Sequence, residues 1–386
     1  MPLRIATLNV WATPAPLARD VSFRIDAIGE KLPDYHLDAI AFQEVWTSEA
    51  RKRLVRAGRR AGLGYAWAGL GRGWAQGTQR GGLLVLSRLP LEGARFAPFS
   101  LRGEPERAIT NLEYVSGKGF VTLTLQTAEG PVRLVNTHLH SGYHHRTHHY
   151  VPHRTAQAIQ VAVDAAQSTI PMVAVGDFNF REGDPDYRVL EALLGVRDAA
   201  VERGQPQNTT LTSNPYRTGR VDRRKDFVFV RDGASQGLGV EGIKRIFDEP
   251  LSFEGRQVAY SNHAGLVVDL SQGGPASASI AQDAAIFRLA AAVLADGKQF
   301  AKQRRNGGRA FARVGLGAGA VAGLCSLPRP VSRRRVLRLA FGAAGLAMLA
   351  PGVGLSVVSE VFVEDEIRAF VLASRQLEEL DRELLS

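Results

Sequence analysis

Apolar and polar positions along residues 3–270 follow the pattern of short strands separated by amphipathic helices. The strand-like runs are rich in β-branched and aromatic residues and are bounded by Gly, Pro or polar residues. The expected strands are Leu3–Trp11, Ala39–Val45, Gly82–Ser87, Phe120–Thr127, Val132–Leu139, Met172–Phe178, Phe227–Val230 and Leu266–Leu270. The expected helices are Phe23–Lys31, Ser48–Ala61, Arg154–Gln167 and Pro185–Leu194.

The segment from Phe120 to Leu139 turns at Glu129 and Gly130 and predicts an antiparallel hairpin. Strands that alternate with helices favour parallel pairing elsewhere in the chain. The two signals together predict an α/β fold, in the α+β sense, with mixed sheets rather than one purely parallel sheet.

Beyond residue 270 the composition changes. The stretch SQGGPASAS (271–279) is typical of a linker. Three regions are therefore expected: a globular domain at residues 1–272, a linker and basic amphipathic helix at 273–313, and a hydrophobic helical tail at 314–386.

The tail contains two apolar stretches, Val314–Leu327 and Leu339–Ser359, and then an acidic amphipathic pattern over Glu364–Ser386. Only the second stretch reaches the roughly 20 residues that a membrane span needs. The excess positive charge lies just before it, between residues 273 and 338, as in segments that face anionic lipid. We therefore expect membrane association, and the positive-inside rule places the globular domain in the cytoplasm.

The composition of the 386 residues, 45% hydrophobic and 22% charged, allows one large core and a substantial appendage. The single cysteine, Cys325, excludes an internal disulfide framework and a Cys-based zinc site, and indicates a reducing compartment. The N-terminus MPLRIATLNVW enters a strand pattern directly, so no N-terminal signal peptide is expected. The net charge of +10 also suits a nucleic-acid binder.

Five short polar clusters occur where apolar strands end. They are Asn9, Gln43-Glu44, Asn136-Thr137-His138, Asp177-Phe178-Asn179 and Asn262-His263. Carboxylate, carboxamide and imidazole groups at strand ends can converge on one pocket although they are far apart in sequence. The pattern predicts a metal-dependent hydrolase.

Glu44 is the leading candidate for a metal ligand. A carboxylate at the end of an apolar strand has a large desolvation cost unless a cation or hydrogen bonds compensate it. Mg²⁺ prefers oxygen ligands and needs only one or two carboxylates, and Asn9 offers a carboxamide oxygen nearby. The alternative for Glu44 is a salt bridge at the strand end.

Asp177 and Asn179 are one residue apart, so on an extended chain they point to the same side. Asp177 can orient a water or bind a metal, and Asn179 can donate to a phosphoryl oxygen, although GDFN also fits a simple Asx turn. His138 and His263 are candidates for proton transfer or charge stabilisation in phosphodiester hydrolysis.

Most of the histidines fall between His138 and His153, in HLHSGYHHRTHHYVPH. Imidazole groups suit transition metals such as zinc. The alternative, which we favour, is a solvated loop beside the active site that contains His138.

The order Asn, Gln-Glu, Asn-Thr-His, Gly-Asp-Phe-Asn, an Asp before an aromatic strand, and Ser-x-His resembles the endonuclease/exonuclease/phosphatase superfamily. This is the fold of pancreatic-type deoxyribonuclease, exonuclease III and the neutral sphingomyelinases. The resemblance covers roughly residues 3–271. It implies a DNase I-like four-layer α/β/β/α sandwich of two mixed β-sheets, here followed by a C-terminal helical, hydrophobic extension.

The resemblance also implies residue roles. Asn9 and Glu44 match the metal-site positions, and the metal would be Mg²⁺, with Mn²⁺ as an alternative. The positions that match the family's catalytic residues are His138, Asp177, Asn179, Asp226 and His263.

One position departs from the family pattern: Asn262 stands where the last motif usually has Asp. Asn brings no charge that favours imidazolium, so His263 could pair with Asp226 instead. Lys118, in Gly-Lys-Gly-Phe, and Arg154, in the helix after Thr-His-Leu-His, resemble the sphingomyelinase branch. Lys118, Arg154 and Asn262 are therefore expected to bind substrate.

The expected function is Mg²⁺-dependent hydrolysis of a phospholipid such as sphingomyelin, by in-line attack of water on phosphorus. The alternative is an endonuclease or exonuclease that acts on DNA or RNA with the same chemistry. A third possibility is a binding module without activity, which Asn262 alone supports. The expected partner is a phospholipid or membrane surface, with nucleic acid as the alternative, and no obligate protein partner is evident.

Overall fold

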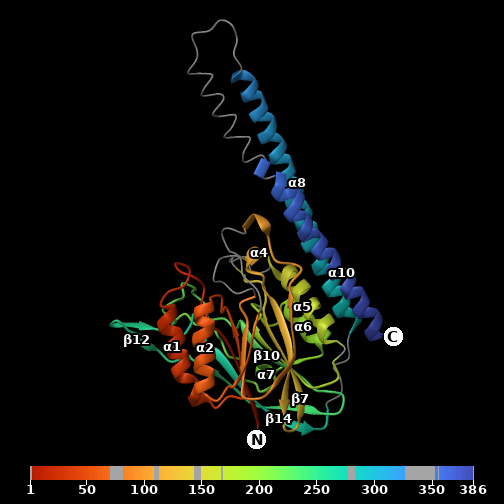
Figure 1. Cartoon of the computed structure of the whole chain (residues 1–386). Helices are drawn as coiled ribbons and strands as arrows, with labels where there is room; N and C mark the ends of the chain where they lie inside the picture. The colour runs from red at the N-terminus through yellow and green to blue at the C-terminus, as the bar shows by residue number, and fades with distance from the viewer. Residues whose placement is uncertain are drawn as a thin grey trace.

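Two six-stranded β-sheets face each other and carry helices on their outer sides (Figure 1). The computed structural model describes residues 2–69, 81–107, 113–142, 149–166, 168–276, 283–326, 353–354 and 356–385. The N-terminus lies at one end of the sandwich, and a long helical hairpin projects beyond the other end.

The first sheet is mixed. Its strand order is β11 (Gly237–Ile246), β14 (Gly265–Gly274), β1 (Leu3–Asn9), β2 (Ala39–Gln43), β4 (Leu84–Ser87) and β3 (Tyr65–Ala68). Strands β1 and β2 are parallel, whereas β1 and β14 are antiparallel. Because β1 and β2 run in the same direction, Asn9 and Gln43 end side by side.

The second sheet repeats this arrangement. Its order is β5 (Leu91–Pro98), β6 (Gly119–Thr127), β7 (Gly130–His138), β8 (Met172–Asp177), β10 (Asp226–Arg231) and β9 (Arg197–Asp198). Strands β6 and β7 form the expected antiparallel hairpin, and β7 runs parallel to β8. The parallel pair brings His138 opposite Asp177.

Aliphatic side chains fill the space between the sheets, where Ile5 and Ala41 from one sheet share a core with Val121 and Val173 from the other. On the outer side of the first sheet lie α1 (Val21–Lys31) and α2 (Ser48–Arg60). On the outer side of the second lie α5 (Val151–Ala165) and α6 (Pro185–Leu194). This is the four-layer sandwich that the sequence predicted, and the expected fold class is confirmed.

Short elements complete the domain. They are the one-turn helices α4 (Glu113–Ser116) and α7 (Ala199–Glu202), the 3₁₀ turns η1 (Leu32–Tyr35) and η2 (Pro105–Arg107), and a ribbon of β12 (Leu251–Phe253) and β13 (Arg256–Val258).

The C-terminal region adds a helical hairpin outside α5 and α6. Helix α8 (Ala284–Ser326) is 43 residues long and packs against α10 (Val363–Leu385), which follows the π-helical turn η3 (Val358–Phe362). Gly297 permits this close approach, because a Cβ there would lie 2.6 Å from the Phe370 ring. Side chains such as Phe287 and Phe370 join the core of the second sheet and its helices.

Helix α8 runs through residue 313 without a break, so the basic segment and the first apolar stretch, as far as Ser326, lie on one helix. Among the described helices none combines the length and the hydropathy needed to cross a membrane. Most of the stretch Leu339–Ser359, and the histidines His144, His145 and His148, lie outside the described residues.

The expected strands and helices are all present, with ends that shift by a few residues; α5, for example, begins at Val151. Strands β3, β5, β9, β11, β12 and β13 are not among the expected strands. β9, β12 and β13 have only two or three residues, β5 is mostly exposed, and the β11 sequence GLGVEGIKRI is rich in glycine, so these segments give no clear strand pattern.

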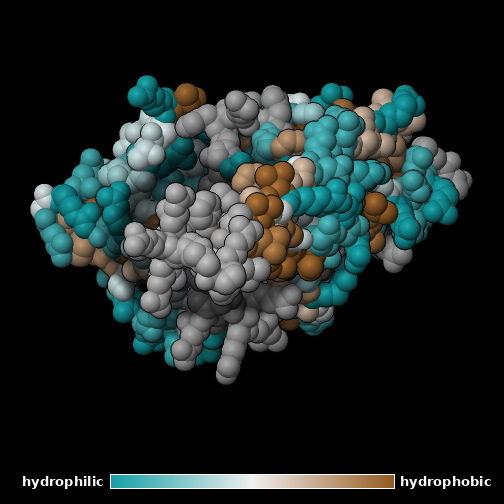
Figure 2. Space-filling model, turned by 90° about the horizontal axis from the view of Figure 1, so that it is seen from above, coloured by the Kyte–Doolittle hydropathy of each residue, from teal (hydrophilic) through white to brown (hydrophobic). Residues whose placement is uncertain are grey.

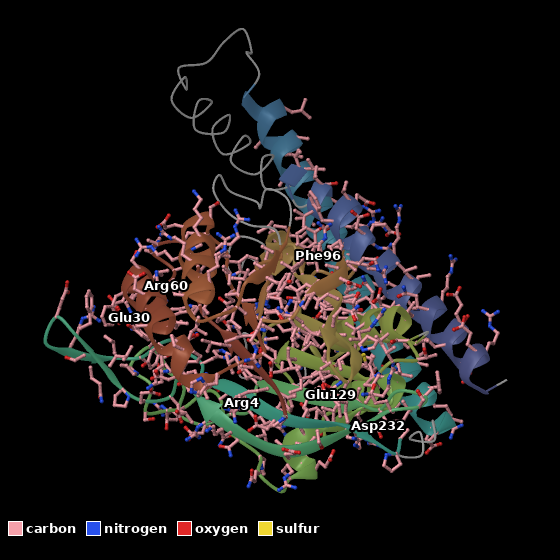
Figure 3. All side chains as sticks on the ribbon, turned by 60° about the horizontal axis from the view of Figure 1, so that its bottom comes forward. Arg4, Glu30, Arg60, Phe96, Glu129 and Asp232 are labelled. Atoms are coloured by element: carbon pink, nitrogen blue, oxygen red, sulfur yellow. The ribbon has the colours of Figure 1, made fainter. Side chains whose placement is uncertain are left out.

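A polar bridge joins the two sheets beneath the strand ends. Gln43 on β2 donates to Asn136 Oδ1 on β7 at 2.8 Å, and Asn136 donates back to the Phe42 carbonyl at 3.1 Å. Gln43 Oε1 has no hydrogen-bond partner in the described part of the chain, but the paired groups link β2 to β7 across the two sheets. The opposite strand ends are held differently: Arg4, labelled in Figure 3, donates to Asp269 at 2.6 Å.

Candidate active site

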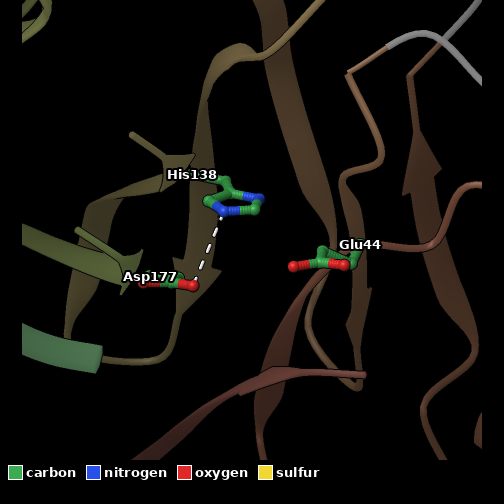
Figure 4. Close-up of side chains that lie close together, drawn as sticks. All are labelled: Glu44, His138 and Asp177. Carbon is green, nitrogen blue, oxygen red and sulfur yellow. Dashed lines mark ion pairs between the residues drawn. The ribbon is translucent and has the colours of Figure 1, made fainter. Parts of the chain in front are cut away.

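The strand ends surround a cavity of about 340 Å³. Its polar lining comes from Glu44, His138, Ser141, Asp177, Asn179, Lys225, Asn262 and His263, and an apolar wall comes from Trp11, Pro14, Leu17 and Trp46. Figure 4 shows Glu44, His138 and Asp177 around a common space, each from a different strand end. The distant polar clusters thus converge on one cavity.

Glu44 follows β2 in a left-handed conformation, with φ 57°, which turns its carboxylate from the sheet into the cavity. Asn9 Nδ2 donates to Glu44 Oε1 at 2.9 Å, and Thr13 Oγ1 donates to Oε2 at 3.2 Å. No cation side chain forms an ion pair with Glu44 in the described part of the chain. A strand-end salt bridge, the alternative for Glu44, is therefore absent there.

Asn9 links two carboxylates. Its Nδ2 also donates to Asp177 Oδ2 at 3.0 Å, while its Oδ1 accepts from the Trp11 backbone N–H at 3.0 Å. A carbonyl oxygen has two lone pairs, so Oδ1 keeps one for a further partner. The hydrogen bond from Asn9 Nδ2 therefore orients the Glu44 carboxylate.

His263 pairs with Asp226. Its Nδ1 lies 2.7 Å from Asp226 Oδ2, and both side chains are buried. Antiparallel pairing of β10 with β8 places Asp226 opposite Asp177, whose Oδ2 lies 3.9 Å from His263 Nε2. Burial by itself lowers the pKa of His263, but the carboxylates of Asp226 and Asp177 outweigh it and raise that pKa.

This pairing supplies the carboxylate that the final motif lacks. Asn262 lines the cavity, and its Oδ1 accepts from Ser261 Oγ at 3.3 Å, so it does not orient the His263 ring. Ser261 Oγ lies 2.6 Å from the Asn9 carbonyl oxygen, which fastens the loop to the end of β1.

His138 is neutral. Complete burial, followed by the positive charge of Lys118, holds its pKa well below the ordinary value. Its Nε2 accepts from Lys118 Nζ at 2.9 Å and lies 3.5 Å from Asp177 Oδ2. Since Nε2 accepts from Lys118, the proton resides on Nδ1, which has no hydrogen-bond partner among the described residues. Burial also raises the pKa of Asp177.

Two overlapping groups of side chains have ligand atoms within 4.8 Å of one another: Glu44, His138 and Asp177, and Asp177, Asp226 and His263. Asp226 Oδ1 is buried and lacks a hydrogen-bond partner in the described part of the chain. Glu44, Asp177 and Asp226 supply carboxylate oxygens to these two groups, and oxygen atoms are the ligands that a hard divalent cation prefers. The residues present therefore fit such an ion.

Two of the residues expected to bind substrate, Lys118 and Arg154, instead bind other side chains of the protein. Lys118 lines the cavity but donates to protein acceptors, among them Glu113 Oε1 at 2.8 Å. Arg154 does not line the cavity; it forms a buried ion pair with Asp186 on α6, with Nε 2.5 Å from Oδ2. The family resemblance selected Arg154 but could not reveal this carboxylate partner.

The cavity also contains residues that the sequence analysis did not select: Lys225, Trp11, Trp46 and Glu113. Each lies within three residues of a selected position or motif, except Glu113 on the one-turn helix α4. Adjacency to a strand-end motif could have identified Lys225, which directly precedes Asp226.

Apart from His138, the described histidines of the His-rich segment do not line the cavity. His149 Nε2 lies 2.7 Å from Glu104 Oε1, and His153 Nε2 lies 3.1 Å from Glu366 Oε1 on α10. His140 stacks on Tyr150 with ring centroids 4.1 Å apart. Among the described residues these side chains do not form a metal-ligating group, and they join the domain to the hairpin.

The chain resembles known proteins over its α/β part. The model of the Endonuclease/Exonuclease/phosphatase family matches residues 6–243. A putative neutral sphingomyelinase of Drosophila melanogaster is 29% identical over 276 residues, which are 69% of this chain and 60% of that protein. The chain thus spans about 60% of the length of that curated relative.

Solved structures share the fold. A Staphylococcus aureus beta toxin mutant with bound magnesium ions superposes with TM-score 0.53 at 17% identity, covering 70% of this chain and 99% of the toxin. Danio rerio TDP2, complexed with a single-strand DNA product, has TM-score 0.54 at 18% identity, with the same coverage. The family match, the two facing mixed sheets and the strand-end cavity agree: this chain belongs to the endonuclease/exonuclease/phosphatase family.

Proposed function

We propose that this protein is a divalent-metal-dependent phosphodiesterase that hydrolyses a phospholipid of the sphingomyelin type by attack of water on phosphorus. The convergence of Glu44, His138, Asp177 and His263 on one cavity carries this proposal. Hydrolysis of a phosphodiester needs an activated water, stabilisation of the phosphoryl oxygens and protonation of the leaving oxygen. The cavity offers groups for each of these tasks.

Glu44 would hold the metal ion, assisted by Asn9, whose Oδ1 has one lone pair left. Mg²⁺ is the expected ion because these donors are oxygens, and Mn²⁺ is the alternative. When bound, the ion neutralises negative charge on the phosphoryl group.

His263 would take the proton of the attacking water. Asp226 accepts from Nδ1, so Nε2 is the nitrogen that faces the cavity and can act as a base. An imidazole oriented by a buried carboxylate keeps one tautomer and one ring position. Asp226 therefore takes the role that the Asp of the usual final motif would have.

His138 and Asn179 would bind the phosphoryl oxygens. The Nδ1–H of neutral His138 is a buried donor without a partner among the described residues. Asn179 has a left-handed backbone, with φ 53°, and its Nδ2 donates to the Leu139 carbonyl at 3.3 Å and to Ser141 Oγ at 3.5 Å; a phosphoryl oxygen would replace the longer of these two contacts. Donors that are fixed before the reaction stabilise charge that develops in the transition state.

A lipid substrate is supported by the hairpin. Tyr114, beside the cavity residue Glu113, contacts Phe362 at the base of the hairpin, with ring centroids 6.0 Å apart. The hairpin projects past this end of the domain (Figure 1) and exposes large apolar side chains. These are Phe311, Val314, Val321, Leu324, Val353, Val357, Val361 and Phe362. Figure 2, seen from this end, shows apolar residues grouped there.

Exposed apolar groups on a monomer mark contact with a partner or a membrane. We propose that the hairpin enters the lipid surface and brings the cavity to the phosphodiester bonds. Trp11, Leu17 and Trp46 would then face the ceramide side of the substrate.

The test compares three substrates under one set of conditions: sphingomyelin in mixed micelles, phosphatidylcholine in mixed micelles, and a short DNA duplex. Release of phosphocholine from sphingomyelin that requires Mg²⁺ and is abolished by EDTA supports the proposal. The matched variants are Glu44→Gln, which we expect to be inactive, and Glu92→Gln, an exposed position on the edge strand β5 that should behave as wild type. Release of nucleotides without phosphocholine would instead establish a nuclease.

A further inference from the structure

We propose that Lys225, and not Lys118, is the lysine that contacts the phosphoryl group of the substrate. This inference rests on the proposed phosphodiesterase function and adds a catalytic residue to it. It stands on a comparison of the two lysines that line the cavity.

Lys118 has no donor to spare. Its Nζ lies within hydrogen-bond distance of four acceptors: Glu113 Oε1 at 2.8 Å, His138 Nε2 at 2.9 Å, Ser141 Oγ at 3.1 Å and the Leu139 carbonyl at 3.2 Å. An ammonium group has only three N–H donors. Lys118 therefore holds the neutral tautomer of His138 and the loop that follows it.

Lys225 is in the opposite situation. In the described part of the chain its Nζ makes one hydrogen bond, to Asn179 Oδ1 at 3.0 Å, and no carboxylate ion pair. Two of its three N–H donors are thus left for another acceptor, and the side chain borders the cavity. A cation with unused donors beside a cavity favours an anionic ligand.

The backbone places Lys225 rigidly beside Asn179. The Phe178 and Asn179 N–H groups both donate to the Lys225 carbonyl, at 2.9 and 3.2 Å, as an extension of the pairing between β8 and β10. The side-chain bond then fixes Oδ1 of Asn179 toward Lys225 and leaves Nδ2 facing away. The two residues form a pair of donors at one side of the cavity.

The surrounding charges agree with this role. Burial lowers the pKa of Lys225, while Asp177 and Asp226 favour its charged form. The lysine offsets part of the negative charge that these carboxylates would present to a phosphodiester. A phosphoryl oxygen that meets Lys225 would find both a charge and a donor.

The first experiment measures hydrolysis of bis(4-nitrophenyl) phosphate with Mg²⁺ by Lys225→Met and Lys225→Arg. Removal of one fixed donor to a developing oxyanion costs about 10²- to 10³-fold in kcat, so Lys225→Met should lose that much and Lys225→Arg should recover part of it. Lys244→Met, which removes an exposed lysine on β11, is the matched control and should keep wild-type rates. Loss of less than threefold in Lys225→Met would overturn the inference.

A double-mutant cycle with Asn179→Ala separates direct contact from an effect through Asn179. Direct contact predicts that Lys225→Met lowers the rate at least tenfold further in the Asn179→Ala background. No further loss in that background would show that Lys225 only positions Asn179, and would refute the proposal. Circular dichroism checks that each variant is folded, and Lys225→Gln replaces any variant that is not.

Binding of inorganic phosphate, measured by calorimetry with Mg²⁺ present, gives a readout that does not need turnover. We expect Lys225→Met to weaken phosphate binding at least tenfold and Lys244→Met to leave it unchanged. If the wild type hydrolyses no phosphodiester but binds phosphate through Lys225, the proposed function fails and the lysine assignment holds. If the wild type is active and Lys225→Met binds phosphate normally, the proposed function holds and the lysine assignment fails.

Discussion

Replacement of Asp226 by Asn tests the central arrangement of the site. The change keeps the size of the side chain and removes one negative charge, 2.7 Å from His263 Nδ1. Both residues are buried, so solvent cannot replace the lost interaction. The amide can also present an N–H to Nδ1, which would favour the wrong tautomer of His263.

The magnitude follows from the geometry. A hydrogen bond to a charged partner contributes about 1.5–3 kcal/mol, and each 1.36 kcal/mol is tenfold in rate. Asp226→Asn should therefore lower kcat about 10- to 150-fold. His263→Ala removes the base itself and should cost roughly 10²- to 10⁴-fold.

The pH dependence has a definite sign. Asp226 and Asp177 raise the pKa of His263 against the effect of burial, so the loss of one carboxylate lowers that pKa. A base works in its deprotonated form, and kcat therefore increases as the pH rises through the pKa. In Asp226→Asn this acid limb should move to lower pH while the plateau falls.

The assay is kcat as a function of pH with bis(4-nitrophenyl) phosphate and saturating Mg²⁺. Asp269→Asn is the matched control, because Asp269 accepts from Arg4 at the far end of the strands. An acid limb that stays in place, together with a loss below threefold, would show that Asp226 does not orient the catalytic base.

Three further predictions concern stability and lipid. Arg154→Met leaves Asp186 as an unpaired buried charge and should lower the free energy of unfolding by about 3–5 kcal/mol in urea titrations; unchanged stability with a raised KM would restore a substrate role for Arg154. Burial alone would raise the pKa of Glu104, but the hydrogen bond with His149 and the positive charge of Arg304 lower it to about 2, against 4.5 normally. Its contribution to stability is thus complete above pH 4.5 and lost as the pH falls toward about 2, a loss that Glu104→Gln should reduce in urea titrations across that range. Phe311→Ser combined with Val314→Ser should weaken sedimentation with sphingomyelin vesicles yet leave hydrolysis of the soluble diester unchanged; normal sedimentation would contradict lipid docking by the hairpin.

The local sequence determined the elements and the positions of the polar clusters. The strand β8 and the helix α6 follow from short-range apolar patterning, and their bounds are close to those expected. Parallel pairing places Gln43 and Glu44 beside the end of β1 in one sheet, and His138 beside Asp177 in the other. The packing of the two sheets then brings both sets of strand ends to one cavity. The sandwich and the family could therefore be predicted from the strand pattern and from the polar clusters that end the strands.

The tertiary structure alone decided which side chains are partners. Arg154 and Asp186 are 32 positions apart in sequence, and no local pattern links them. Asp226 and His263 are 37 positions apart; the family resemblance offered their pairing as one option, and the structure places the two side chains 2.7 Å apart. The partners of Lys118 also could not be read from local sequence, because its ammonium donates to Glu113 on a helix and to Ser141 in a loop. Hydrophobic periodicity reports which face of an element is buried, but a hydrogen bond between distant residues depends on strand register and helix packing, which only the folded chain fixes.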